Sequence, residues 1–283
     1  MSIPFSPYAG TGPSNVPRSI LLGVSWLNAQ NQPRLNVNCS VSQPNGQTPV
    51  IDLDASIEEE IGSFGCTWLA LPTSDSDFRF GQITIDTNHP AIQPSSQPYL
   101  PRNTSIPISF TTPYSTGNIP KVAVWIHGID SESESGHDFR VSASNVDHKG
   151  FRIDCLVGLQ TQCCVCQIGV TWLAYPTTRS DIYSGSFDTT EAVGTREIED
   201  KTPNSGSGQT IASYMGSTEF DIQFTKIPKV FMGFSQLHIG EGDARVWLKN
   251  GVVTPEMLPW QVDTWGKTML VNAQGTYIAV DST

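Results

Sequence analysis

Short segments of the chain alternate between apolar and polar residues with the two-residue period of a β-strand. Residues 141–146 show this alternation, and apolar runs at 122–126 and 167–172 are bounded by turn-forming residues. Residues 57–61 and 191–201 tolerate a helix, but they are too short or too polar to predict one. The pattern therefore predicts an all-β fold of antiparallel sandwiches.

A pattern of arginine and aromatic positions occurs three times along the chain. The arginines, separated by 106 and 105 residues, are Arg34, Arg140 and Arg245. Each is followed by a Thr-aromatic-aliphatic-Ala segment, and the aromatic residues, separated by 104 and 105 residues, are Trp68, Trp172 and Tyr277. A connector also repeats, because residues 69–77 resemble residues 173–181. A period near 105 residues predicts three tandem copies of one small β domain.

The predicted domains span residues 1–74, 75–178 and 179–283. The second and third each open with a strand pattern, at residues 80–85 and 183–187, and the residues before Phe5 offer no counterpart. We therefore expect the first domain to lack this strand or to borrow one from elsewhere. Three similar units can close into an intramolecular pseudo-trimer, because tethering raises their effective concentration for one another. An open string of domains is the alternative.

Charge and hydropathy limit the partners and the location of the protein. The formal net charge is −11, from 16 basic and 27 acidic residues, and no basic stripe is present. A nucleic-acid partner is not expected on these electrostatic grounds. No apolar run is long enough to span a bilayer, so membrane insertion is not expected either. The first six residues lack a basic start and an apolar segment, which favours a cytoplasmic protein or one secreted by a non-classical route.

Metal binding has two candidate positions in the sequence. Cys155, Cys163, Cys164 and Cys166 could supply thiolates to zinc, although no paired C-x-x-C spacing occurs and small apolar filling of a strand is the alternative. The acidic stretch from Asp130 to Asp138 could supply oxygen ligands to calcium, although its spacing misses the twelve-residue loop and solvated hairpin tips look similar. We predict no metal and no cofactor.

Enzymatic activity is not predicted. The five histidines lie in different contexts and do not recur at matching positions of the repeats. The chain contains no G-x-S-x-G elbow, phosphate loop, dinucleotide fingerprint or H-E-x-x-H motif. Acidic residues are numerous, so counting alone does not exclude a carboxylate pair for glycoside hydrolysis.

Several short motifs resemble the H-type lectin domain of snail agglutinins, the C-terminal part of slime-mould discoidins and many fungal proteins. In the second repeat these motifs occupy residues 110–114, 120–122, 139–141, 150–151 and 170–174. The first repeat carries them at residues 5–8, Arg34 and Trp68, and the third repeat matches less fully. The resemblance implies a β-sandwich that commonly assembles as a trimer, with sugar sites near the subunit boundaries. Higher oligomers of a pseudo-trimer would then be compatible with the fold.

The resemblance also implies which residues bind carbohydrate. The arginine matching Arg140 belongs to the N-acetylgalactosamine site of the family, so Arg34, Arg140 and Arg245 are the predicted site residues. The alternative for each is a salt bridge between repeats, which suits an acidic protein. Trp265 matches the tryptophan that lines the family's site, whereas the following position, a histidine in the snail proteins, is Gly266 here.

The predicted function is non-enzymatic, multivalent binding of glycans or glycoproteins, with degenerate sites for galactose or N-acetylgalactosamine. The alternative is a structural or protein-interaction module on a lectin scaffold that has lost sugar binding. Trp26, Trp125 and Trp247 lie inside apolar strand patterns, so we expect them to pack in the core or between repeats.

Overall fold

A computed structural model describes residues 2–4, 18–29, 34–42, 50–55, 61–92, 99–133, 136–158, 163–200, 209–240 and 242–281, and the predicted all-β fold is confirmed in it. The strands of the first part of the chain are β1 (Ser2–Pro4), β2 (Arg18–Ala29), β3 (Arg34–Ser42), β4 (Val50–Ala55), β5 (Ile61–Pro72), β6 (Arg79–Asp86), β7 (Asn103–Ser109), β8 (Pro120–Glu132) and β9 (His137–Ser144). They are followed by β10 (Gly150–Val157), β11 (Cys164–Pro176), β12 (Ile182–Asp188), the short 3-10 helix η2 (Thr189–Glu191), β13 (Gly194–Asp200), β14 (Gln209–Glu219), β15 (Lys229–Ile239), β16 (Ala244–Asn250), β17 (Met257–Thr264) and β18 (Leu270–Val280).

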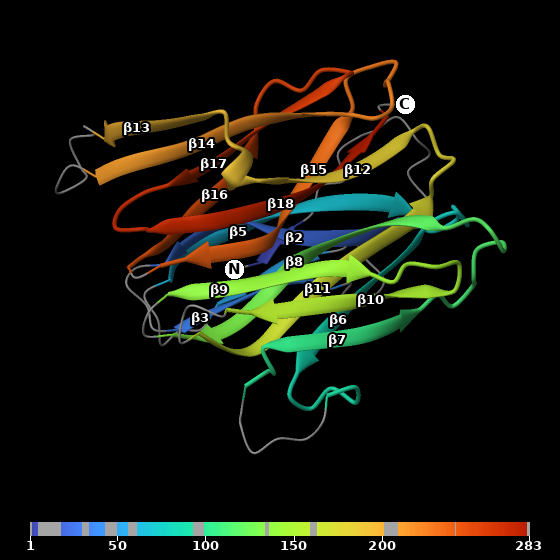
Figure 1. Ribbon diagram of the computed structural model, residues 1–283, viewed down its shortest axis with the longest axis horizontal. Helices are drawn as coiled ribbons and strands as arrows, with labels where there is room; N and C mark the ends of the chain where they lie inside the picture. Colours follow the sequence, from blue (N-terminus) through green and yellow to red (C-terminus); the bar gives the residue numbers. More distant parts are fainter. Residues whose placement is uncertain are drawn as a thin grey trace.

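These strands form three antiparallel sheets, and each sheet combines two distant parts of the chain (Figure 1). Sheet A has the strand order β1-β4-β3-β8-β11-β6, sheet B the order β13-β14-β17-β16-β2-β5, and sheet C the order β12-β18-β15-β9-β10-β7. We call the pairings of β3 with β8, β9 with β15, and β16 with β2 the first, second and third junctions. Each junction joins strands from two of the predicted domains, whose boundaries remain predictions.

The strands β2, β8 and β15 contact one another. They pair with β5, β11 and β18, respectively, and in each of these pairings one residue of the first strand is skipped, which makes a β-bulge. The skipped residues are Ser25, His127 and Ser235. The recurring aromatics Trp68, Trp172 and Tyr277 all pair with the third residue before such a bulge, namely Leu22, Val124 and Met232. A bulge fixes local register and twist. The recurring sequence positions therefore occupy the same place in the three pairs of strands.

A single tryptophan fills the space where β2, β8 and β15 meet. Trp125 is fully buried and donates its Nε1–H to the carbonyl oxygen of Leu22 at 2.7 Å. The residues at the same distance before the bulge in the other two strands are Gly23 and Gly233. A Cβ on Gly23 would lie 2.6 Å from Cδ1 of Trp125, and a Cβ on Gly233 would lie 3.1 Å from the same atom. One indole thus occupies the room that two glycines leave.

The strand predicted to be missing from the first repeat has no equivalent among the described residues. In sheet A, β6 pairs with the outer edge of β11, and in sheet C, β12 pairs with the outer edge of β18. Within the described part of sheet B, β5 is the last strand and pairs with β2 alone. The outer edge of β5 therefore differs from the corresponding edges of the other two sheets.

Two segments differ from the sequence-based expectation. The strand expected at residues 122–126 continues to Glu132, and β9 begins at His137, so the acidic stretch is mostly strand. Pairing of β8 with both β3 and β11 explains this extension, because it satisfies the backbone groups of the polar residues. In the segment that tolerates a helix, Glu191 is the last residue of η2, and Gly194–Asp200 form the strand β13.

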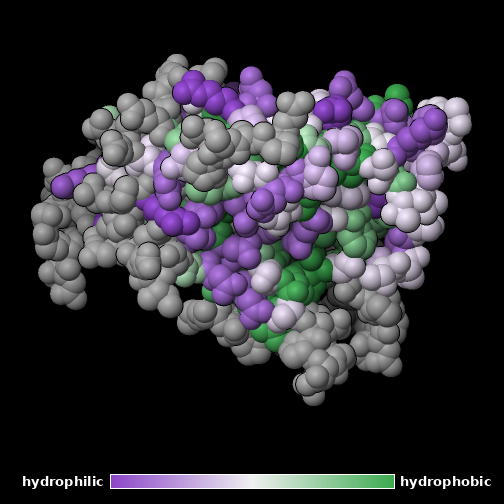
Figure 2. All heavy atoms as spheres, turned by 90° about the horizontal axis from the view of Figure 1, so that it is seen from below, coloured by the Kyte–Doolittle hydropathy of each residue, from purple (hydrophilic) through white to green (hydrophobic). Residues whose placement is uncertain are grey.

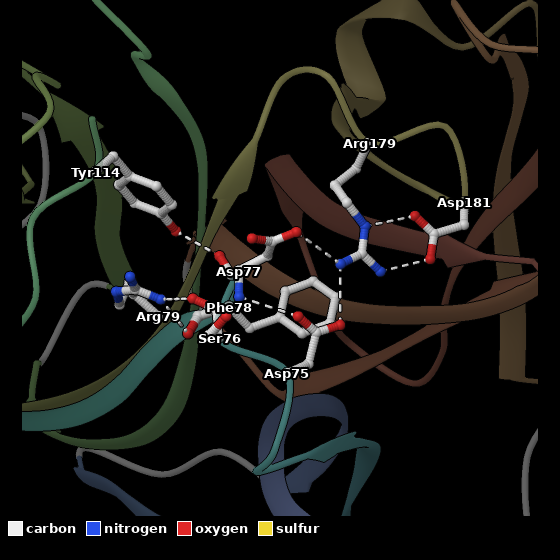
Figure 3. Close-up of polar contacts among 8 residues, drawn as sticks. All are labelled: Asp75, Ser76, Asp77, Phe78, Arg79, Tyr114, Arg179 and Asp181. Carbon is white, nitrogen blue, oxygen red and sulfur yellow. Dashed lines mark hydrogen bonds and ion pairs between the residues drawn. The ribbon is translucent and has the colours of Figure 1, made fainter. Parts of the chain in front are cut away.

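An ion-pair cluster joins the ends of the two repeated connectors, at residues 75–77 and 179–181 (Figure 3). Arg179 donates two hydrogen bonds to Asp181, at 2.7 and 2.5 Å, and contacts Asp75 at 2.9 Å and Asp77 at 3.3 Å. The guanidinium also lies 4.8 Å from the ring centroid of Phe78. Hydrogen bonding to Arg179 lowers the pKa of the Asp181 carboxyl. Arg179 thus holds together segments that are 104 residues apart in sequence.

Among the coloured residues of the face drawn in Figure 2, hydrophilic side chains lie over the middle of the face, and hydrophobic ones show in a smaller patch beside them. The described residues contain no helix of the length and hydropathy that crossing a bilayer requires.

Candidate functional site

A polar cleft lies at the second junction, where β9 and β15 separate. The two strands pair only from His137 to Arg140 on β9, opposite Ile239 to Gln236 on β15. Past this point a cleft of about 250 Å³ opens between them. The residues lining it are Lys121, Val122, Ala123, Val124, Arg140, Val141, Ser142, Ala143, Ser184, Gly185, Ser186, Ser235, Gln274 and Thr276. The cleft thus combines strands from the second and third predicted domains.

Arg140 is the last paired residue of β9 at this junction, and its side chain lines the cleft. Its Nε atom is buried and has no hydrogen-bond partner among the described residues. A buried donor without a partner costs roughly 1–3 kcal/mol, and such groups in folded proteins call for an explanation. Because this atom is shielded from solvent, a ligand in the cleft could accept its hydrogen bond only after the Arg140 side chain shifts toward it.

The rest of the cleft combines short hydrogen-bonding groups with the apolar residues Val122, Val124 and Val141. Hydroxyls come from Ser142, Ser184, Ser186 and Thr276, and an amide comes from Gln274. Such side chains both donate and accept hydrogen bonds, as sugar hydroxyls do. Lys121 adds an ammonium group, which lies 3.8 Å from the ring centroid of Tyr183. The chemistry of this set suits a neutral polyhydroxylated ligand.

Arg34, at the first junction, is engaged by carboxylates. Its guanidinium donates two hydrogen bonds of 2.9 Å to the two oxygens of Asp130, and Glu132 lies 3.7 Å away. The hydrogen bonds to Asp130 are the main cause that raises the pKa of Arg34. Because Asp130 belongs to β8 and Arg34 to β3, this is a salt bridge between two predicted domains. The contacts of Arg34 are thus those of the alternative given for it above, a salt bridge between repeats.

Arg245, near the third junction, is buried under a turn. Its side chain is 9% exposed, and its Nε lies 3.3 Å from Asp243 Oδ2. Gly266 closes over this pair, since a Cβ there would lie 2.5 Å from Arg245 Nη1. The turn is tied by the Lys267 N–H, which donates to Asp243 at 3.0 Å, and by the Thr268 hydroxyl, which donates to the Trp265 carbonyl at 2.8 Å. The structure brings Arg245 and Trp265 close together, with Arg245 supporting the turn that carries Trp265.

The strand register separates the three predicted arginines. Arg140 faces Gln236, which directly follows the bulge at Ser235. Arg245 faces Asn28, three residues past Ser25, and Arg34 faces Glu132, five residues past His127. At the third junction Trp247 faces Trp26, the residue directly after the bulge. Trp247 therefore takes the position that Arg140 takes at the second junction, and the sequence spacing did not reveal this.

Trp247 was expected to pack in the core or between repeats, and it does contact Trp26 of the first predicted repeat, although it stays 46% exposed. Its ring centroid lies 6.3 Å from that of the half-buried Trp26, with 41° between the planes. Lys249 Nζ lies 4.4 Å from the Trp247 centroid and forms an ion pair with Asp263. Together these residues form an aromatic surface with charged groups beside it. The expectation for Trp125 is confirmed.

Neither the cysteines considered for zinc nor a hydrogen-bonded Ser–His pair has the surroundings that metal binding or catalysis needs. In the described part of the chain, no three His, Cys, Asp or Glu side chains are close enough together to hold a metal ion. Burial raises the pKa of Cys155 to about 12 and that of Cys163 to about 11, which disfavours the thiolate that zinc requires. Ser131 and His137 are hydrogen-bonded at 2.9 Å, but both are buried, so a substrate cannot reach the serine.

Several predicted positions lie outside the described residues. They are the motif at residues 5–8, residues 57–60 of the segment that tolerates a helix, Glu134 of the acidic stretch, and Lys201.

Comparison with known proteins gives two findings. Residues 105–175 and 217–280 match the model of the H-type lectin domain. The structure of wild-type discoidin II from Dictyostelium discoideum is similar at 14% identity and a TM-score of 0.24, over 71% of this chain and 94% of that chain. A search among curated proteins finds no match. The match to the domain model supports the H-type lectin resemblance for two segments, and carbohydrate binding without catalysis is the activity that this indicates.

Proposed function

We propose that the whole chain is an H-type lectin-like protein with three tandem repeats, closed around an axis as a pseudo-trimer, and that it binds carbohydrate without catalysis. The two matched segments support the relationship, since they hold Arg140, Arg245 and Trp265. The cyclic pairing supports the closed arrangement, because the first repeat pairs with the second, the second with the third, and the third with the first.

Arg140 lines a cleft that also offers hydroxyl and amide groups, and the described residues give it no carboxylate partner; this is the observation that carries the proposal. A guanidinium donates in a fixed fork, which can hold two adjacent hydroxyls in a set geometry. Arg34 instead donates hydrogen bonds to Asp130. Arg245 Nε also lacks a hydrogen-bond partner among the described residues, but it lies 3.3 Å from the Asp243 carboxylate in an ion pair. We therefore propose the second junction as the principal sugar site, with Arg34 and Arg245 as supports of the other two junctions.

The Trp26–Trp247 surface is proposed as a weaker sugar contact at the third junction. Aromatic faces stack on the apolar side of sugar rings, and the neighbouring Lys249 and Asp263 supply groups that hydrogen-bond hydroxyls. Two separate sites on one chain would strengthen binding to a surface with many glycans by avidity. Trp265 remains a third candidate, at the turn above Arg245.

The test is binding to a glycan array followed by calorimetry with the selected sugar. Galactose and N-acetylgalactosamine glycans come first, because the resemblance implies them. Arg140→Ala should weaken binding at least about tenfold while the fold survives. Arg152→Ala is the matched control, because Arg152 lies on β10 of the same sheet and binds Ser105 outside the cleft. Equal loss in both variants, or binding unaffected by Arg140→Ala, would reject the cleft.

We further propose that the protein is cytoplasmic or secreted by a non-classical route, that its partners are glycans or glycoproteins, and that the closed unit forms higher oligomers. Trp247→Ala should reduce binding to a dense glycan surface more than binding to a single soluble sugar, whereas Val252→Ala, at an 85% exposed position, should change neither. Turnover of a chromogenic glycoside by the purified protein would contradict the non-enzymatic reading.

A further inference from the structure

Two of the six cysteines lie side by side inside the first predicted domain. Cys39 belongs to β3 of sheet A and Cys66 to β5 of sheet B, and their side chains are hydrogen-bonded to each other. Cys39 is fully buried, and Cys66 packs against the same hydrophobic core while staying partly exposed. The two thiols therefore bridge two separate sheets.

Cys66 takes the place of a buried valine in the next pair of central strands. It pairs with Val24, the residue directly before the bulge at Ser25. In β11, the residue that pairs directly before the corresponding bulge is Val170, which is fully buried. The position therefore faces the core in both pairs of strands.

Cys39 takes the place of a second buried valine. It follows Asn38, which faces the residue directly after the bulge of β8. In β9, Arg140 faces the residue directly after the bulge of β15, and Val141 comes next. Val141 is buried like Cys39. Because two valines fill these positions in the second predicted domain, packing alone does not require sulfur at the corresponding positions of the first.

The hydrogen bond makes the two thiols unequal. The Cys39 S–H donates to the Cys66 sulfur, which lowers the pKa of Cys66 and raises that of Cys39, and burial raises the pKa of Cys39 further. The thiolate, which is the nucleophilic form, therefore arises first at Cys66. Burial instead raises the pKa of Cys155 to about 12 and that of Cys163 to about 11. A partly exposed thiol with thiolate character, next to a second thiol, is the arrangement of redox-sensing cysteines.

We propose that Cys39 and Cys66 form a reversible disulfide when the protein meets a peroxide, and that this bond locks β3 to β5. The Cys66 thiolate attacks one oxygen of hydrogen peroxide, so that an S–O bond forms, the O–O bond breaks, and hydroxide leaves and takes up a proton to become water. The Cys39 thiol then loses its proton and attacks the sulfur of the Cys66 sulfenic acid, so that the S–S bond forms and a second water leaves. Two thiols are thus oxidised, and one peroxide is reduced to two molecules of water.

The bond would stabilise the first predicted domain. It closes residues 40–65 into a loop, and a cross-link of this kind stabilises a protein mainly by restricting the unfolded chain. Cys39 lies directly after the last residue that pairs at the first junction, whereas the proposed sugar cleft lies at the second. Either proposal can therefore fail without the other.

The test starts from reduced protein freed of reductant, adds hydrogen peroxide, and then alkylates the remaining thiols. Mass spectrometry of a non-reduced digest should show a peptide linked through Cys39 and Cys66 as the main product, and dithiothreitol should remove the link. The urea midpoint of the oxidised protein should be higher than that of the reduced protein. The absence of this link, linkage mainly through other cysteines, or an unchanged urea midpoint would overturn the proposal.

Variants identify the thiol that reacts first. Cys39→Val, which copies the residue type of Val141, should abolish the link and leave a sulfenic acid at Cys66, where dimedone traps it as a stable adduct. Cys66→Val, which copies Val170, should leave Cys39 unmodified, and the two alanine variants serve if a valine does not fit. Cys164→Ser removes a half-buried thiol of β11 and is the matched control, which should form the link like the unchanged protein. A dimedone adduct at Cys39 in place of Cys66, or loss of the link in Cys164→Ser, would contradict the assigned roles.

Oxidation in concentrated urea separates the folded geometry from chance. In the unfolded chain the six cysteines have no fixed neighbours, so we expect a mixture of links there. If the same single pair forms in urea, the fold does not select it, and the proposal fails.

Discussion

Replacing Trp125 and Gly23, separately and together, tests whether one indole fills the space between the three central strands. Trp125 is fully buried, and its Nε1–H satisfies the Leu22 carbonyl at 2.7 Å. Truncating a buried aromatic residue to alanine costs about 3–5 kcal/mol of unfolding free energy, through lost transfer energy and the cavity that remains. The unsatisfied Leu22 carbonyl adds to this loss, so we expect Trp125→Ala to cost about 5 kcal/mol.

Gly23→Ala has the opposite defect, because it adds volume to the same space. Its Cβ would lie 2.6 Å from Trp125 Cδ1 and 2.9 Å from Phe231 Cζ. Overpacking of this kind costs about 1–3 kcal/mol. In the double variant the indole is gone and the methyl group has room on that side. We therefore expect the double variant to be about as stable as Trp125→Ala alone, with a coupling energy of about 1–2 kcal/mol.

The measurement is urea unfolding followed by far-ultraviolet circular dichroism for all three variants. Gly194→Ala is the matched control, because a Cβ at Gly194 would have no heavy atom within 4 Å. It should unfold within about 0.5 kcal/mol of the unchanged protein. If the costs of Gly23→Ala and Trp125→Ala add within about 0.5 kcal/mol, the two residues do not share one space, and the packing reasoning is refuted.

Three further predictions concern titration and a strained turn. Burial lowers the pKa of His127 to about 4, so the unfolded state takes up a proton before the folded state does as the pH falls. The free energy of unfolding should therefore decline by at most about 3 kcal/mol between pH 6.5 and 4, and the urea midpoint of His127→Gln should decline less over this range. Arg179 lowers the pKa of Asp181, so their pairing stabilises the fold above about pH 4 and is lost as the pH falls below it. Arg179→Ala should therefore have a lower thermal midpoint than the unchanged protein at pH 7 and a smaller difference in acid, and an equal difference at every pH would contradict this. Gly266→Ala should cost about 2 kcal/mol in urea unfolding, because Gly266 has a φ of 71° and lies against Arg245, and an unchanged midpoint would show that the turn yields.

Local patterns were sufficient to predict the strands and the recurring aromatic positions. The alternation that begins at residue 141 corresponds to β9, because a strand with one buried face must place apolar residues at every second position. The continuous apolar run around Trp172 corresponds to β11, which is buried on both faces there. The strands at residues 80–85 and 183–187 were found in the same way and are β6 and β12.

The site could be predicted only in part, because it depends on pairing between distant segments. Arg140 was found from the family motif and does line a cleft. The sequence aligned Arg245 with it, but shifting a residue by two positions along a strand leaves it on the same face and moves it along the junction by about 7 Å. Only the bulges at Ser25 and Ser235 show that Trp247 is the true counterpart. Its exposure could not be predicted either, since an apolar strand pattern does not say which face meets solvent.

Covalent linkage gives the proposed closed arrangement a freedom that three identical subunits lack. Where three copies of one strand meet, identical chains must place the same residue three times, and three indoles would overfill a space that one indole and two glycines fill here. A tandem chain can divide the volume unequally among Gly23, Trp125 and Gly233. The same freedom applies to the junctions, where Arg140 lines a cleft, Arg34 forms a salt bridge, and Trp247 exposes an aromatic ring. We therefore expect unequal binding at the three junctions, so that calorimetry with one monosaccharide should give fewer sites than repeats.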